Sequence, residues 1–96
     1  MTADGTKALE AELVSESAIS LGRAGTRLQE ALDALAAHAG DDEARRELVE
    51  DAGERAWEFV VLRSALGWHD DLRALDAYGV PVEVRARMGV RRRTTT

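Results

Sequence analysis

The chain has 96 residues and a formal net charge of −5, from 18 acidic side chains against 13 lysines and arginines. A chain of this length holds one domain, which excludes multi-domain enzymes. Alanine supplies 17 residues and larger apolar side chains another 26, a balance that favours helices over strands. We therefore expect a single helical domain over residues 1–90 and a basic C-terminal tail over residues 91–96.

The chain contains no cysteine, which excludes disulfides, thiolate metal ligands and cysteine nucleophiles. The first residues lack the basic and then apolar run of a secretory signal, and no stretch of 18 apolar residues occurs. These features predict a cytoplasmic protein that does not associate with membranes.

Charge is divided unevenly along the chain. Residues 1–79 carry 17 acidic and 8 basic side chains, whereas residues 80–96 carry five basic and one acidic. An acidic body repels phosphate backbones, so we do not expect the whole domain to bind nucleic acid. The C-terminal arginines either stay solvated or dock on acidic side chains of the same chain or of a partner chain. These arginines are Arg85, Arg87, Arg91, Arg92 and Arg93.

A first long helix is predicted over about residues 6–39, where apolar and small residues recur in alternating steps of four and three. This stripe consists of Val14, Ala18, Leu21, Gly25, Leu28, Leu32, Leu35 and Ala39. Gly22 and Gly25 each cost a helix about 1 kcal/mol relative to alanine. They therefore indicate either the close approach of another helix, which we favour, or a bend.

A second long helix is predicted over about residues 42–66, with acidic residues at its start and Gly67 as its stop. Trp57, Val60 and Val61 make its second half apolar on more than one side, which predicts that other elements surround it. Two short helices should follow. One runs from Asp70 or Asp71 to Tyr78, and the other begins at Pro81 and ends before Gly89. The residues predicted to form the core are Leu48, Trp57, Phe59, Leu62, Leu66, Leu75 and Tyr78.

The first predicted helix is too long for a compact domain of this size. About 34 residues span roughly 50 Å, whereas a domain of about 100 residues has a radius of gyration near 13 Å. One end must protrude, and its apolar stripe predicts a homodimer unless the helix bends. The predicted dimer interface contains Val14, Ala18, Leu21, Gly22, Gly25 and Leu28.

No set of residues predicts a catalytic, cofactor or metal site. His69 beside Asp70 resembles a metal-binding pair of hydrolases, but it sits where one helix ends and another begins, which explains it locally. Arg63, next to the most apolar segment, is predicted to be partly buried and to need a carboxylate from Asp70, Asp71 or Glu58. Residues 79–88 fit a DNA-reading helix-turn-helix poorly, because the second helix is barely two turns long.

Three stretches, taken together, resemble a family of small uncharacterised bacterial proteins, a domain of unknown function. They are residues 20–25 (SLGRAG), Trp57 with Arg63 and Gly67, and residues 78–81 (YGVP) leading to Val84, Arg87 and Gly89. The likeness covers residues 9–89. It implies a small helical bacterial protein and brings no catalytic residue, cofactor or partner.

The sequence thus predicts an all-α fold in which a long antiparallel helical hairpin is followed by two short helices, with two chains forming a helical bundle. The expected function is non-enzymatic, through homodimerisation and binding of an unidentified protein. The alternative is a nucleic-acid-associated regulator that uses the C-terminal arginines, and a third, weaker hypothesis is a metal-dependent hydrolase at His69.

Overall fold

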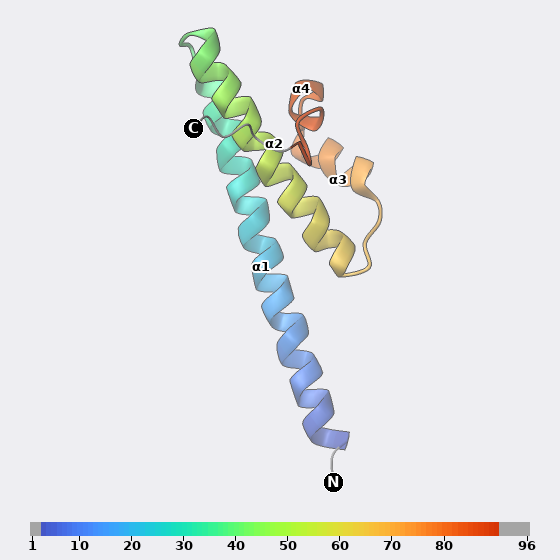
Figure 1. Cartoon of the computed structure of the whole chain (residues 1–96). Helices are drawn as coiled ribbons and strands as arrows, with labels where there is room; N and C mark the ends of the chain where they lie inside the picture. The colour runs from blue at the N-terminus through green and yellow to red at the C-terminus, as the bar shows by residue number, and fades with distance from the viewer. Residues whose placement is uncertain (1–2, 91–96) are drawn as a thin grey trace.

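The computed structural model describes residues 3–90, except that side chains within the first helix are described only for Leu9, Glu12 and from Ser15 onward. Over this range the chain forms α1 (Ala3–Ala37), α2 (Asp42–Ala65), α3 (Asp71–Tyr78) and α4 (Val82–Arg85). Helices α1 and α2 form an antiparallel hairpin, and α3 and α4 lie against α2 (Figure 1). The prediction of two long packed helices followed by two short ones is confirmed.

Helix α1 runs without interruption through Gly22 and Gly25, so these glycines do not mark a bend. It ends two residues earlier than predicted, at Ala37, and the turn into α2 closes on local hydrogen bonds. The Gly40 amide donates to Nε2 of His38 over 3.1 Å, and the Ala44 amide donates to the Asp41 carboxylate over 2.8 Å. Asp41 is therefore the N-cap of α2, as its residue type predicts.

The described core lies between α1 and α2 and extends under α3 and α4. Leu28 of α1 and Val84 of α4 are its largest fully buried side chains. The rings of Phe59 and Tyr78 meet edge to face with centroids 4.9 Å apart. The buried apolar residues are Ala24, Leu28, Ala31, Leu32, Leu35, Val49, Ala52, Ala56, Phe59, Val60, Ala74, Leu75, Val80 and Val84.

The seven residues predicted to form the core differ in burial. Phe59 and Leu75 are buried, whereas the four residues Leu48, Leu62, Leu66 and Tyr78 are partly buried. The placement of Trp57 in the core is wrong, because its side chain is 48% exposed. The ring of Trp57 lies at the surface of α2 and packs on one side against Gly89, where an added Cβ would lie 3.6 Å away.

The last short helix packs against α2 at a glycine. A Cβ added to Gly53 would lie 2.7 Å from the Cβ of Arg87 and 3.2 Å from its carbonyl oxygen. The missing side chain of Gly53 therefore allows the turn after α4 to approach α2 at backbone distance. The left-handed backbone of Gly79, with φ of 67°, sends the chain from α3 toward this contact.

The molecule is elongated, with extents of 63 × 34 × 20 Å and a radius of gyration of 16.7 Å. Figure 1 shows the cause, since the N-terminal half of α1 projects beyond the end of α2. A 24-residue helix is shorter than a 35-residue helix by about 16 Å at 1.5 Å per residue. Among the described residues of α1, Ala24 is the first that is buried, so no described helix covers the N-terminal part of α1 (Figure 1).

Candidate functional site

The most distinctive surface of the molecule is residues 9–23 of α1, which we call the uncovered stretch. None of its described side chains is buried. Leu9 is 57% exposed and Ile19 is 54% exposed, whereas Ser17 and Leu21 are half-buried. A helix of this kind offers apolar and small side chains to a second helix.

The predicted interface residues are placed unequally. Ala18 and Gly22 are exposed and Leu21 is half-buried, so all three remain accessible. The side chain of Val14 lies outside the described residues. Gly25 and Leu28 do not belong to an accessible interface, because both are buried within the chain. Leu28 belongs to the core, and Gly25 lies against the side chains of Phe59 and Tyr78.

Gly22 and Gly25 have different surroundings. A Cβ added to Gly25 would lie 2.5 Å from the hydroxyl oxygen of Tyr78 and 3.5 Å from the ring of Phe59. Gly25 therefore allows the close approach that we favoured, although the neighbours are side chains of α2 and α3. Among the described residues, a Cβ added to Gly22 would meet nothing within 4 Å, so their packing does not require that glycine.

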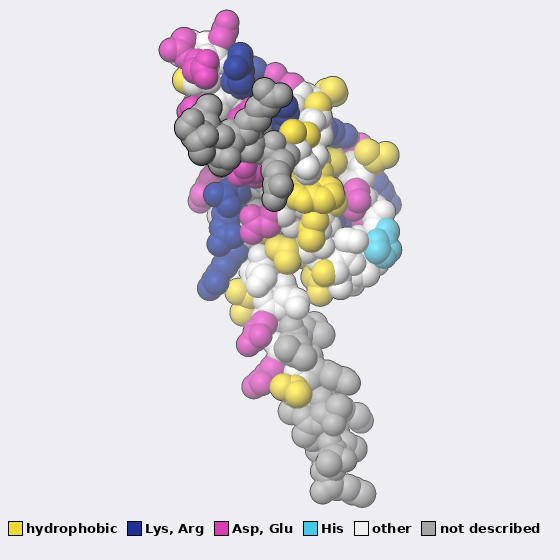
Figure 2. Space-filling model, viewed as in Figure 1, with side chains coloured by type: hydrophobic (Ala, Val, Ile, Leu, Met, Phe, Trp, Pro, Cys, Tyr) yellow, Lys and Arg dark blue, Asp and Glu magenta, His cyan; other side chains and the backbone are white. Residues whose placement is uncertain are grey.

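A second group of exposed apolar side chains lies on the body. Figure 2 shows apolar side chains gathered along the face toward the viewer, with charged side chains around them. Trp57 and Val61 lie four residues apart on one side of α2 and are 48% and 44% exposed. Val82 of α4 is 82% exposed. The body thus has apolar surface outside α1 as well.

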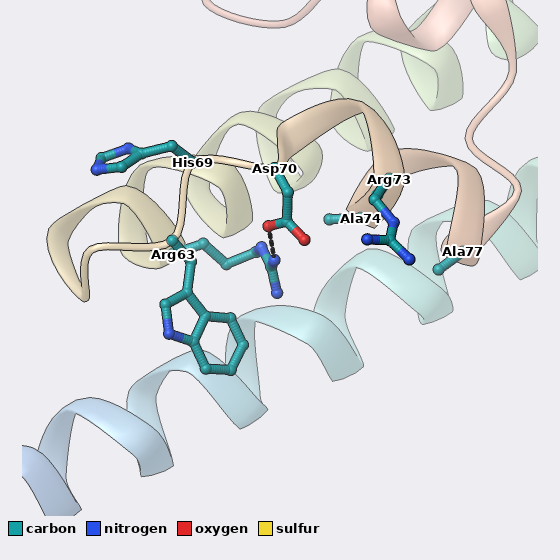
Figure 3. Close-up of a pocket in the computed structure, with 7 residues that line it drawn as sticks. Arg63, His69, Asp70, Arg73, Ala74 and Ala77 are labelled. Carbon is teal, nitrogen blue, oxygen red and sulfur yellow. Dashed lines mark hydrogen bonds and ion pairs between the residues drawn. The ribbon is translucent and has the colours of Figure 1, made fainter.

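Arg63 is the most enclosed charged group that sequence analysis singled out, and its predicted partial burial is confirmed. Its side chain is 12% exposed and makes an ion pair with Asp70 (Figure 3). The guanidinium carbon lies 4.7 Å from the ring centroid of Trp68 and 5.7 Å from that of Phe59. This arrangement suits a planar cation, which attracts both the carboxylate and the faces of aromatic rings.

Asp70 accepts a hydrogen bond from Arg63, which lowers the pKa of the carboxyl below its ordinary value. The same contact explains why Asp70, although it is the N-cap residue of α3, makes no side-chain capping bond. The carboxylate of Asp70 turns toward Arg63 in Figure 3, whereas the ring of His69 points away. The pair therefore holds the end of α2 to the start of α3.

A pocket surrounds this ion pair, lined by Arg63, Trp68, His69, Asp70, Arg73, Ala74 and Ala77. His69 and Asp70 do not converge there. Within residues 3–90, and among the side chains that are described, no group of three metal-binding side chains lies close enough to hold an ion. The hypothesis of a metal-dependent hydrolase at His69 thus gains no support from the pocket.

Two of the C-terminal arginines bind acidic side chains of the same chain. Arg85 forms an ion pair with Asp76 at 2.7 Å and donates to the Val80 carbonyl oxygen at 2.8 Å. Arg87 pairs with Glu50 of α2 at 3.2 Å. Arg91, Arg92 and Arg93 lie outside the described residues. For Arg85 and Arg87, docking on the same chain is therefore the observed arrangement.

A further ion pair joins α2 to α4, and sequence analysis did not single it out. Arg45 donates to Glu83 over 2.8 Å. This hydrogen bond lowers the pKa of the Glu83 carboxyl and raises that of the Arg45 guanidinium. Because the two residues are 38 positions apart, no local spacing rule could have predicted the pair.

Comparison with known proteins identifies the family of the chain but no activity. The model of a family of unknown function, DUF6665, matches residues 2–95. The chain belongs to this family. The predicted resemblance to a domain of unknown function is thereby confirmed. Searches of curated proteins and of solved structures found no significant match. Among the described helices, none combines the length and the apolar character needed to cross a membrane.

Proposed function

We propose that this member of the DUF6665 family is a non-enzymatic protein that acts by self-association, and that the uncovered stretch of α1 is where a second copy binds. The observation that carries the proposal is the projection of α1 beyond α2, with Leu9 and Ile19 more than half exposed. A homodimer would cover this stretch and present the body of each chain to other proteins.

The composition of the uncovered stretch supports a second helix at this position. An isolated helix as short as residues 9–23 is only marginally stable in water, because most helical stability in proteins comes from packing. The stretch contains Ser15, Ser17, Ser20 and Gly22, all poorer helix formers than alanine. A helix so weak in intrinsic propensity gains most from a partner along its length.

The non-enzymatic part of the proposal is supported by how the charged groups near the pocket are used. The carboxylate of Asp70 is bound to Arg63, and the guanidinium of Arg63 lies near the rings of Trp68 and Phe59. Both groups thus connect α2 to α3. For the alternative function as a nucleic-acid-associated regulator, the described arginines offer little, since Arg85 and Arg87 are already paired with acidic side chains.

Sedimentation equilibrium at micromolar concentration tests the proposal. The expected mass is twice the 10.4 kDa of one chain. Replacing Ile19 with glutamate should shift the protein to monomers, because a charge would be buried between the two copies. The matched control is Val82→Glu, which adds the same charge at a residue of α4 that is 82% exposed. A wild-type protein of single-chain mass at every concentration would refute self-association.

A further inference from the structure

One exposed side of α1 carries charges that change sign at Ile19. Glu12 and Glu16 precede Ile19, and Arg23 and Arg27 follow it. At 3.6 residues per turn, these five residues fall within an arc of about 80° on α1. All five are exposed. The buried residues Ala24, Leu28, Leu32 and Leu35, which pack toward α2, lie on the other side of the helix. The five residues, which we call the Ile19 face, are therefore accessible to another molecule.

We propose that two copies of the chain pair through the Ile19 face with their α1 helices antiparallel and with Ile19 close to the two-fold axis. This inference rests on the proposed self-association and specifies its geometry. Glu16 then lies opposite Arg23 of the partner subunit, and Glu12 lies opposite Arg27 of the partner subunit. The two-fold axis repeats both pairs, so the face is complementary to itself.

Charge decides between the two possible directions. In a parallel pair, each acidic residue of the face would lie beside the same acidic residue of the second copy, and each arginine beside an arginine. Opposite charges across an interface set its orientation and register, and like charges disfavour the alternative. Arg27 already pairs with Glu58 at 3.0 Å, with both side chains more than one third exposed. It would therefore bridge two carboxylates in the dimer.

Length supports the same register. Helix α1 extends from Ala3 to Ala37, so Ile19 lies within about one residue of its midpoint. Antiparallel helices centred there overlap along almost their whole length. The N-terminal half of α1 in one copy then lies beside the C-terminal half of α1 in the other copy. It contacts that half on the side that α2 leaves exposed. Pairing through the Ile19 face also leaves the half-buried Leu21 packed against the core. The side of α1 that carries Leu21 does not have to face the partner.

Charge reversal tests the pairing. Glu16→Arg and Arg23→Glu should each raise the dissociation constant of the dimer about tenfold, since each dimer loses two exposed ion pairs and gains two like-charge contacts. The double variant E16R/R23E should return the dissociation constant close to the wild-type value, because the opposite charges are exchanged. The controls E47R and R46E make the same changes at exposed residues of α2 and should leave dimerisation unchanged.

Spin labels measure the direction independently, and the absence of cysteine makes each label unique. Ser20→Cys and Thr26→Cys place neutral, exposed attachment points on either side of the Ile19 face. In the antiparallel dimer with Glu16 opposite Arg23 of the partner subunit, the two labels at position 20 are offset by about 2 Å along the helix axis and those at position 26 by about 20 Å. In a parallel dimer neither pair is offset.

The outcomes separate the two proposals. Restored dimerisation in E16R/R23E, together with a longer label distance at position 26 than at position 20, supports the antiparallel Ile19 face. A dimer with equal distances at both positions, or without restoration in the double variant, overturns this geometry while self-association stands. A wild-type protein that remains monomeric overturns both.

Discussion

Gly25 of α1 and Tyr78 of α3 are in contact. The hydroxyl of Tyr78 occupies the space that a side chain at position 25 would need. A Cβ at Gly25 would lie 2.5 Å from that hydroxyl oxygen. The contact brings the end of α3 onto α1, beside the ring of Phe59 from α2. Three helices therefore meet at a residue without a side chain.

We predict opposite effects of alanine at the two glycines of α1. Gly22→Ala should raise the free energy of unfolding by about 0.5–1 kcal/mol, because alanine favours the helix and the site is open. Gly25→Ala should lower it by about 1–2 kcal/mol, because overpacking against Tyr78 exceeds the gain in propensity. Urea unfolding at one protein concentration measures both. Equal stabilisation by the two substitutions would show that Tyr78 moves aside without cost.

Gly53→Ala should separate α4 from α2. The added methyl group would lie 2.7 Å from the Cβ of Arg87 and 3.1 Å from its carbonyl carbon, and a backbone cannot rotate away as a flexible side chain does. We expect a loss of about 2 kcal/mol in the free energy of unfolding, net of the gain in helix propensity. Thermal unfolding measures it, with Gly22→Ala as the control. A variant as stable as that control would contradict the close contact.

Replacing Arg63 with lysine should destabilise the protein by about 1–2 kcal/mol, although the charge is kept. Lysine lacks the planar group that lies over Trp68 and Phe59 while it binds Asp70. The control is Arg46→Lys on the exposed side of α2. If Arg63→Lys unfolds at the same urea concentration as the wild type, the planar shape of Arg63 makes no contribution to stability.

Stability should fall as the solution becomes acidic. The pKa values of Asp70 and Glu83 are lowered in the folded state by hydrogen bonds from Arg63 and Arg45. A carboxyl with a lowered pKa stabilises the fold above its unfolded-state pKa, and this contribution is lost as pH falls through the folded value. From about pH 5 downward, the wild type should therefore lose more stability than D70N or E83Q.

The control for the pH series is Glu47→Gln, at an exposed residue of α2 for which no ion pair is described. Chemical unfolding at several pH values gives the slope of stability against pH for each variant. A slope for D70N or E83Q that equals the slope for E47Q would refute the contribution of the two ion pairs.

Features that depend on near neighbours in the chain could be predicted from the sequence. Helix periodicity, the N-cap Asp41 and the glycine stop at Gly79 all act within a few residues. The partner of Arg63 was also within reach, because Asp70 is only seven positions away and three candidate carboxylates were close. These local rules place all four helices to within a few residues.

Contacts between distant segments were not predictable in the same way. Apolar periodicity shows that one side of a helix is hydrophobic, but it does not show which element covers that side. Trp57 was therefore predicted to lie in the core, although it is exposed. The roles of Gly53 and Gly25 depend on contacts with Arg87 and Tyr78, which are distant in the sequence. The assignment of Gly25 and Leu28 to a dimer interface failed for the same reason, since α2 and α3 already occupy that side of α1.

The elongated outline has a hydrodynamic consequence. A particle 63 Å long and 20 Å thick in its narrowest direction experiences more friction than a sphere of equal mass. Even a single chain would elute from a sizing column ahead of compact proteins of its weight. Its tumbling in solution would also be anisotropic, with amide bonds along α1 relaxing differently in NMR from those lying across the long axis.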